Sequence, residues 1–181
     1  MKIITEGGMT NNIKNSITAF SLSLLIFSTH NAMGATVNKE NLWNFISNMQ
    51  NHVRETNTGN VQKFAIPVRI ASENEYTKFY VGDAVSLLDG IEISDIDLRI
   101  SKVDKKSPAF FSFSVSGSCI TLDEVKKYYG ELELTDYPTG RSLEERSSYT
   151  TGGNQYGQHI SFGFSAKKPQ CLSQVVIDSD E

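Results

Sequence analysis

Cys119 and His159 are the two side chains of this sequence best suited to covalent chemistry. Cys119 follows a strand-like run at residues 110–116 and precedes a helical segment that Thr121 opens and Gly130 ends. A helix N-terminus stabilises a thiolate, and a histidine on a later strand can accept the thiol proton. One interpretation of the sequence is therefore a cysteine nucleophile with a histidine base.

The order of these residues resembles, in plan, the secreted NlpC/P60 cysteine peptidases of cell-wall peptides. The resemblance implies a cell-envelope hydrolase with Cys119 as nucleophile and His159 as base. The motif of that family places an acidic residue before the nucleophile, whereas this sequence has Ser118 there. No third polar residue that would orient the histidine is evident. We keep this hydrolase as an alternative function.

Cys171 competes with that chemistry for the sulfur of Cys119. These are the two cysteines of the chain, and in an oxidising compartment an even count favours a disulfide. A bridge would close a long loop and stabilise the fold by about 4 kcal/mol on the chain-entropy model. We therefore expect a Cys119–Cys171 disulfide.

No other cluster of polar residues has the spacing of a metal or catalytic site. His52 and His159 lack a partner ligand at zinc spacing. Glu144 and Glu145 are adjacent, so on a strand they would point to opposite faces and could not flank one glycosidic bond. The sequence predicts no metal and no cofactor.

The first 34 residues read as a secretory signal peptide. Lys14 precedes a short apolar run at residues 17–27, and small residues follow at 32–35. A positively charged segment, a short apolar segment and a cleavage site of small residues are typical of such signals. Met9 is an alternative translation start. We expect cleavage to leave residues 35–181 as a single exported domain, periplasmic or secreted, with no stable membrane anchor.

The composition of the chain bounds its partners. The net charge is −4, while 39% of the residues are hydrophobic and 21% are charged. Nucleic-acid binding normally needs a basic face, so this charge argues against it. The proportions are those of a globular domain that can bury a core.

An amphipathic helix is expected at the start of this domain, over residues 38–56 with Asn38 as N-cap. Apolar side chains recur at helical spacing and define one face. They are Leu42, Phe45, Ile46, Met49 and Val53.

Alternating apolar residues predict strands over most of the remaining chain. The central strand covers 110–116, and the similar run at 160–165 is expected to pair with it. Apolar residues also alternate at 64–70. Asp89-Gly90 predicts a hairpin turn, and the apolar phase changes around residues 94–95, which predicts a bulge.

A short helix should follow the central strand, because Thr121 and Glu124 form a capping box and Gly130 stands at a helix end. The fold class expected from these elements is α+β. It comprises a mainly antiparallel sheet, an N-terminal amphipathic helix, a short capped helix after the central strand and one disulfide.

Two polar stretches, at 136–142 and 147–158, are expected to form long loops. They place tyrosines among Gly, Ser, Thr, Asn and Gln, a mixture typical of binding loops. The residues expected to contact a partner are Tyr137, Arg141, Tyr149 and Tyr156.

These features together favour a small exported binding protein that inhibits or neutralises a protein partner in the cell envelope. Its plan resembles periplasmic inhibitor or immunity proteins. Besides the hydrolase, a structural component of an envelope or secretion assembly is a further alternative.

Overall fold

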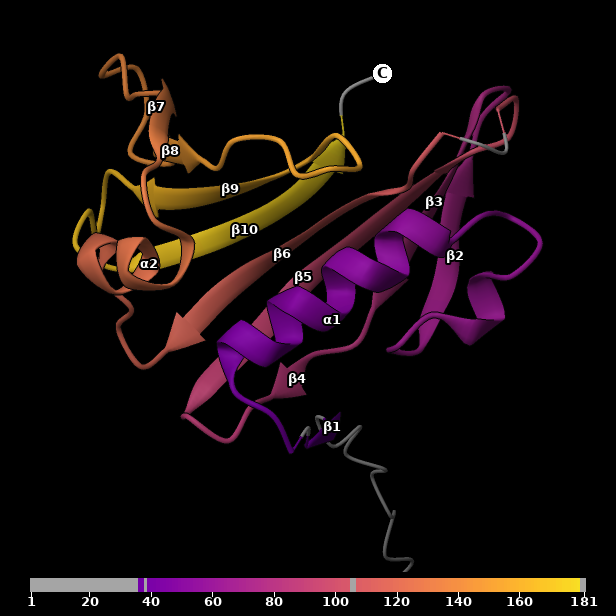
Figure 1. The fold of residues 1–181 in the computed structure, drawn as a ribbon, viewed down its shortest axis with the longest axis horizontal. Helices are drawn as coiled ribbons and strands as arrows, with labels where there is room; N and C mark the ends of the chain where they lie inside the picture. Colours follow the sequence, from indigo (N-terminus) through magenta and orange to yellow (C-terminus); the bar gives the residue numbers. More distant parts are fainter. Residues whose placement is uncertain (1–35, 38, 105–106, 180–181) are drawn as a thin grey trace, which may run out of the picture. The chain divides into compact units, whose positions relative to one another are not determined.

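The fold was analysed in a computed structural model that describes residues 36–37, 39–104 and 107–179. The chain divides into two units, Met1–Met33 and Gly34–Glu181, and the description below concerns the second. The predicted signal segment at 1–34, with Met9, lies outside the described residues. The second unit is an α+β fold with a mostly antiparallel sheet and two α-helices, which confirms the predicted fold class (Figure 1).

Ten strands form this sheet, in the order β1-β4-β5-β6-β10-β9-β8-β7, with β3 also paired to β5 and β2 to β3. The described strand pairs are antiparallel except β1 with β4. The strands are β1 (Thr36–Val37), β2 (Val68–Glu73), β3 (Thr77–Gly82), β4 (Val85–Ser86), β5 (Ile91–Ser101), β6 (Phe110–Gly117), β7 (Glu133–Asp136), β8 (Arg146–Thr150), β9 (Gln158–Ser165) and β10 (Leu172–Ser179).

Helix α1 (Leu42–Glu55) lies across β5 and β6 (Figure 1). All five apolar residues of the predicted stripe are buried, as expected for an amphipathic helix on a sheet. The N-cap is Asn41 and not Asn38, so the helix begins later than predicted. The Asn41 side chain accepts the Asn44 N–H at 3.0 Å, and Asp89 accepts the Leu42 N–H at 3.0 Å. These two bonds satisfy two of the N–H groups that have no partner within the first turn of the helix.

One face of the sheet forms the core beneath α1. Phe113 of β6 meets Phe45 edge-on, with ring centres 5.4 Å apart. Phe113 lies opposite Val175, and Val175 lies opposite Phe162 on the other side of β10. Residues directly opposite each other share a face, so these strands present one continuous apolar surface to the helix.

Helix α2 (Leu122–Tyr129) packs on the same side. The capping box of Thr121 and Glu124 is present, and Gly130 ends the helix with φ +74°, so both predictions are confirmed. The Tyr129 ring lies 4.9 Å from that of Phe162. Trp43 of α1 stacks on Tyr128 at 4.2 Å between ring centres and joins the two helices.

The predicted bulge in β5 is also confirmed. Its pairing with β6 shifts register between Ser94 and Asp97, and Asp95 has φ +48°. The extra residue changes the side-chain phase, so Ile93 and Ile96 are both buried in the core.

Three predictions about strands are wrong. β6 and β9 do not pair, because β10 lies between them and pairs with both. Phe64 and Ile66 are buried, but they precede β2, which starts at Val68 after Pro67 and the 3-10 turn Val61–Lys63. A proline has no N–H to give to a ladder, so the strand begins beyond it.

The third error concerns the polar stretch at 147–158, because residues up to Thr150 belong to β8. On the face of the sheet that points away from the helices, hydroxyl groups link β8 to its neighbours. The Thr150 hydroxyl lies 2.7 Å from that of Thr135 on β7 and 2.8 Å from that of Ser161 on β9. These bonds tie β8 to both neighbours without an apolar pattern in the sequence.

Candidate functional site

One face of the sheet points away from α1 and α2 (Figure 1). Alternate side chains of a strand point to opposite faces, so Ser112 and Ser114 point away from α1. Within the described residues, no helix covers this face. Ser112, Val176, Ser161 and Thr150 form one row across four strands, so the centre of the face carries small uncharged side chains.

A different group of residues stands at one end of this face. Arg99 of β5 lies opposite Phe79 of β3 on one side and Phe110 of β6 on the other. Its guanidinium carbon lies 4.6 Å from the centre of the Phe110 ring and 5.8 Å from that of Phe79. The cation is thus flanked by two aromatic rings, which is a favourable arrangement.

Asp97 fixes the orientation of Arg99 within this group. Its Oδ2 atom accepts hydrogen bonds from Nε at 2.8 Å and from Nη2 at 2.6 Å. A planar guanidinium held through two nitrogens by a carboxylate is rigid and charge-compensated. Arg99 therefore offers a partner a preorganised flat surface.

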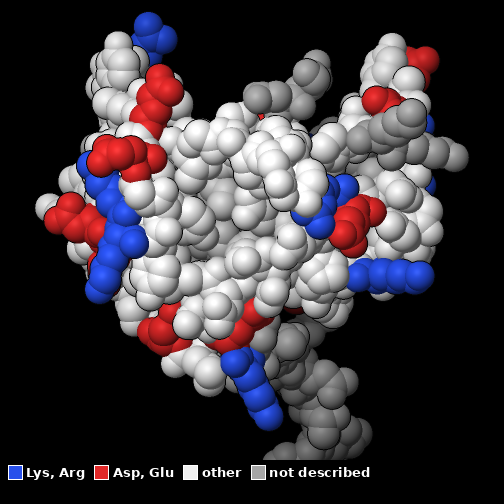
Figure 2. Space-filling model, viewed as in Figure 1, with Lys and Arg blue, Asp and Glu red and all other residues white. Residues whose placement is uncertain are grey.

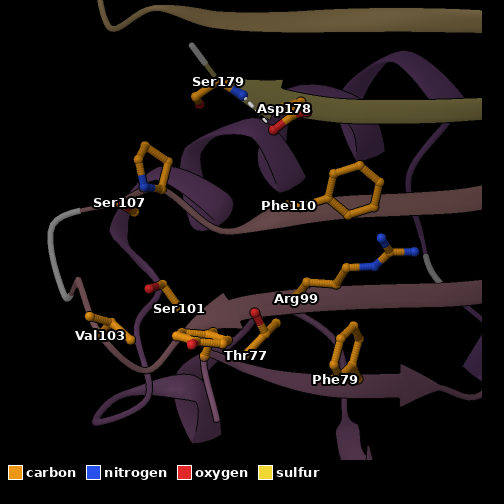
Figure 3. Close-up of a pocket in the computed structure, with 11 residues that line it drawn as sticks. Thr77, Phe79, Arg99, Ser101, Val103, Ser107, Phe110, Asp178 and Ser179 are labelled. Atoms are coloured by element: carbon orange, nitrogen blue, oxygen red, sulfur yellow. Dashed lines mark hydrogen bonds between the residues drawn. The ribbon is translucent and has the colours of Figure 1, made fainter. Parts of the chain in front are cut away.

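Phe79, Arg99 and Phe110 line a hollow of about 530 Å³, which we call the Arg99 hollow (Figure 3). Tyr76 and Val103 stand at its rim, and their side chains are 63% and 70% exposed. Its wall combines aromatic and apolar side chains with hydroxyl groups, the Arg99 guanidinium and one carboxylate. The lining residues are Tyr76, Thr77, Phe79, Arg99, Ser101, Val103, Ser107, Pro108, Phe110, Asp178 and Ser179.

Lys102, which follows β5, links the end of that strand to the β2–β3 turn that carries Tyr76. Its N–H donates to the Tyr76 carbonyl at 2.7 Å, and its ammonium donates to the Asn74 carbonyl at 2.8 Å. The ammonium also lies 3.7 Å from the Glu73 carboxylate. The β2–β3 turn is therefore held to the end of β5, which keeps Tyr76 beside the hollow.

The tyrosines predicted from the sequence do not form one surface. Tyr137 and Arg141 are exposed in the β7–β8 connection, whereas Tyr156 lies in the β8–β9 turn at the other end of β8. The five residues of β8 span roughly 17 Å. Partner binding by these residues stays a prediction, and it would have to use two separate regions.

Glu145 shapes the turn that carries Arg141. Its carboxylate accepts the N–H groups of Gly140 and Arg141, both at 2.9 Å, and of Ser142 at 3.1 Å. Desolvation alone would raise the pKa of Glu145, but backbone hydrogen bonds from Gly140, Thr139 and Arg141 lower it below its usual value. The turn is thus built around an ionised carboxylate.

Cys119 and His159 are not brought together. Cys119 is bonded to Cys171, with Cα atoms 5.0 Å apart, so the predicted disulfide is confirmed. Cys171 directly precedes β10, whereas His159 pairs with Asp178 near the end of that strand. Eight strand residues span about 26 Å. The geometry does not support the cysteine–histidine pair of the hydrolase alternative.

In the described part of the chain, no group of three or more potential metal ligands occurs. The same residues include no helix long and apolar enough to cross a membrane. Comparisons with protein-family models, with curated proteins and with solved structures found no match.

The Arg99 hollow was missed by the sequence analysis. Phe79, Arg99 and Phe110 lie far apart in the chain and meet only through the register of β3, β5 and β6. The sequence did contain one indication of this site, at Phe110. In β6 this residue is two positions from Ser112 and four from Ser114, so it lies on the same face of the strand as they do. An aromatic residue on the otherwise serine-rich face of a strand indicates a contact.

Proposed function

We propose that this protein is an exported binding protein that inhibits or neutralises a protein partner, and that the Arg99 hollow is its principal contact site. The observation that carries the proposal is the stack of Phe79, Arg99 and Phe110 at the end of an uncovered sheet face. Aromatic residues and arginine dominate the energetics of protein interfaces.

The chemistry of the hollow favours an aromatic or aliphatic anchor side chain from the partner. Because Asp97 already compensates the charge of Arg99, burial of the hollow leaves no isolated arginine charge there. The rings of Phe79 and Phe110 supply apolar area, and the hydroxyls of Ser101 and Ser107 can satisfy polar groups around the anchor. An anchor of this kind leaves Arg99 paired, and a hydrogen-bond donor of the partner is needed at the Asp178 carboxylate, which also lines the hollow.

Export rests on two features of the chain. Disulfides persist in oxidising compartments, and the Cys119–Cys171 bridge is present. The signature at residues 1–34 predicts a mature N-terminus between Ala32 and Thr36. Intact-mass analysis of the protein recovered from the periplasm or medium tests this. A soluble form that retains residues 9–31 would contradict it.

The contact site is tested with Tyr76→Ala and Phe110→Ala, against Leu88→Ala as a matched control. Leu88 is 67% exposed and lies outside the hollow. Binding to a partner isolated from envelope extract is measured by calorimetry with purified components. We expect each hollow variant to weaken binding about thirtyfold, the effect of roughly 2 kcal/mol, and the control to leave it unchanged.

The alternative site and the alternative function are tested in the same series. Tyr137→Ala with Arg141→Ala, or Tyr156→Ala, would weaken binding if the predicted tyrosine regions were the contact instead. In that case the hollow variants would bind normally and the location of the site would be wrong. Turnover of cell-wall peptides by the wild type, abolished in His159→Ala, would overturn the binding proposal in favour of the hydrolase.

A further inference from the structure

A second hollow, of about 240 Å³, lies on the helix-bearing side of the sheet, opposite the Arg99 hollow. It is bounded by Gln50 of α1, Tyr129 at the end of α2, the β8–β9 turn and the first residues of β9. We call it the Tyr129 hollow. Its lining residues are Gln50, Tyr129, Thr151, Gly152, Asn154, Gln158 and Ile160.

Its floor is a fixed network of amide groups. The Gln158 side chain is 1% exposed, and its Nε2 donates to the Gln50 carbonyl at 3.0 Å. Its Oε1 accepts from Asn154 Nδ2 at 3.2 Å. Asn154 Oδ1 in turn accepts the Gln158 N–H at 3.1 Å. A buried polar group held on both sides has one orientation, so the floor is preorganised.

A contact outside the lining joins α1 to the β8–β9 turn that borders the hollow. The Arg54 guanidinium lies 4.2 Å from the centre of the Tyr156 ring. The Tyr156 N–H donates to Asn154 Oδ1 at 2.8 Å. Arg54 thus holds the β8–β9 turn against the helix, and its charge faces an aromatic ring and not the hollow.

The polar side-chain groups of two lining residues, the Tyr129 hydroxyl and the Gln50 amide, make no hydrogen bond among the described residues. Burial raises the pKa of Tyr129 to about 12, so this hydroxyl keeps its proton and can both donate and accept. Asn154 Nδ2 donates one hydrogen to Gln158, and an amide nitrogen carries a second. Hydrogen-bond donors and acceptors of these lining residues therefore remain available to a ligand in the Tyr129 hollow.

None of the described residues that line this hollow is charged. On this side of the molecule, acidic and basic residues gather around the rim while the centre is uncharged (Figure 2). An ionic ligand would find no counter-charge here, and a purely apolar ligand would leave the amide groups without hydrogen bonds. The complementary ligand is neutral, rich in hydroxyl or amide groups, and has an apolar face for the partly exposed Tyr129 ring.

We propose that the Tyr129 hollow binds a neutral sugar ring, either as a free sugar or as one unit of a glycan. A hexose or N-acetylhexosamine has hydroxyl groups around its edge and C–H groups on its faces, which matches the available polar groups of Tyr129, Gln50 and Asn154 and the ring of Tyr129. The proposal does not depend on the partner-binding function, because it uses other residues on the other face of the sheet.

The test is an NMR titration of the protein, as isolated from expressing cells, with N-acetylglucosamine and with its β-1,4-linked trimer. We expect saturable shifts of the Gly152, Gln158 and Ile160 amides with a dissociation constant on the order of 1 mM. Tighter binding of the trimer would indicate a glycan, and equal binding a free sugar. Glucuronate, an anionic sugar, should bind more weakly than either.

Two substitutions remove the available groups without disturbing the floor. Tyr129→Phe keeps the ring and removes the hydroxyl, while Gln50→Ala keeps the carbonyl that Gln158 uses. Each should weaken sugar binding about threefold to tenfold, the effect of one hydrogen bond. Their matched controls, Tyr128→Phe and Asn51→Ala, alter neighbouring residues outside the hollow and should leave binding unchanged.

The proposal is overturned if neither sugar shifts these amides, or if the controls lose as much affinity as the hollow variants. It is also overturned if glucuronate binds as well as the neutral sugars. Because Tyr129→Phe changes no carbon packing, its circular dichroism and melting temperature should match the wild type. This match separates a loss of binding from a loss of fold.

Discussion

The ring of Tyr149 meets the ring of Phe164 edge-on, with 5.8 Å between their centres. Tyr149 also lies directly opposite Phe162 in the sheet. It therefore belongs to the margin of the core, although the sequence places it in a polar stretch. Tyr156, by contrast, is more than half exposed in the β8–β9 turn.

These surroundings predict different effects for the two tyrosines. Tyr149→Ala should lower the free energy of unfolding by about 2 kcal/mol, because it removes half-buried aromatic contacts. Tyr156→Ala should lower it by only about 0.5–1 kcal/mol, the value of an exposed contact between a cation and a ring. Urea unfolding measures both, and Tyr149→Phe is the control that keeps the ring. Equal losses would show that Tyr149 contributes no core packing.

The disulfide should contribute strongly to stability. Replacing Cys119 and Cys171 together by serine should lower the free energy of unfolding by about 4 kcal/mol, since the bridge closes a long loop in the unfolded chain. Equilibrium unfolding with and without reductant checks this. The wild type should release no free thiol when titrated under denaturing conditions, whereas a fast-reacting thiol at Cys119 would mean that the bridge is absent in solution.

The turn around Glu145 should respond to acid. Desolvation raises the pKa of Glu145, but its backbone hydrogen bonds outweigh this, so the folded pKa lies below 4.5. A lowered folded pKa means that the stabilisation is complete above the unfolded pKa and is lost as the pH falls through the folded pKa. The amide protons of Gly140 and Arg141 should therefore titrate with a midpoint below the usual pKa of a glutamate.

Glu145→Gln should abolish this titration, because a neutral amide accepts weaker hydrogen bonds. Glu144→Gln is the matched control, since Glu144 pairs with Lys167 and not with the turn. A midpoint at or above the usual glutamate pKa would contradict the structure.

Gly117 should be intolerant of any side chain. It has φ +87°, and a Cβ atom there would lie 2.2 Å from the Gly90 carbonyl oxygen. Gly130 also has a positive φ, but a Cβ atom there would meet nothing within 4 Å. Gly130→Ala should therefore cost about 1–3 kcal/mol from backbone strain alone, because φ +74° with ψ −141° is close to a conformation that essentially only glycine adopts. Gly117→Ala should cost several kcal/mol more, because a clash between backbone atoms adds to that strain. Thermal unfolding of both variants separates backbone strain from the steric clash. Equal losses of stability in the two variants would contradict the close approach of Gly117 to the Gly90 carbonyl.

Local patterns in the sequence identified the elements whose causes are themselves local. The stripe from Leu42 to Val53, the capping box of Thr121 and Glu124, and the phase change that predicted the β5 bulge all depend on residues a few positions apart. Helix periodicity, cap chemistry and side-chain alternation act over that range. The disulfide could also be predicted from the sequence, because two cysteines can pair in only one way.

Sheet order and the candidate sites were decided by contacts between distant residues. The runs at 110–116 and 160–165 share the same alternation of apolar and small residues, yet they do not pair. β10 lies between them, because its residues Val175 and Ile177 are buried against both neighbours. Nothing in the alternation of one strand specifies which neighbour it chooses. Cys119 and His159 were separated for the same reason.

The sequence by itself determined the class of fold, its two helices and its disulfide, since these follow from periodicity, capping and counting. Only the tertiary structure brought Phe79, Arg99 and Phe110 into one stack and closed a charge-free hollow beside Tyr129. Both arrangements depend on strand register and on turn packing. These are set by the fit of side chains far apart in the chain, and no local pattern encodes that fit.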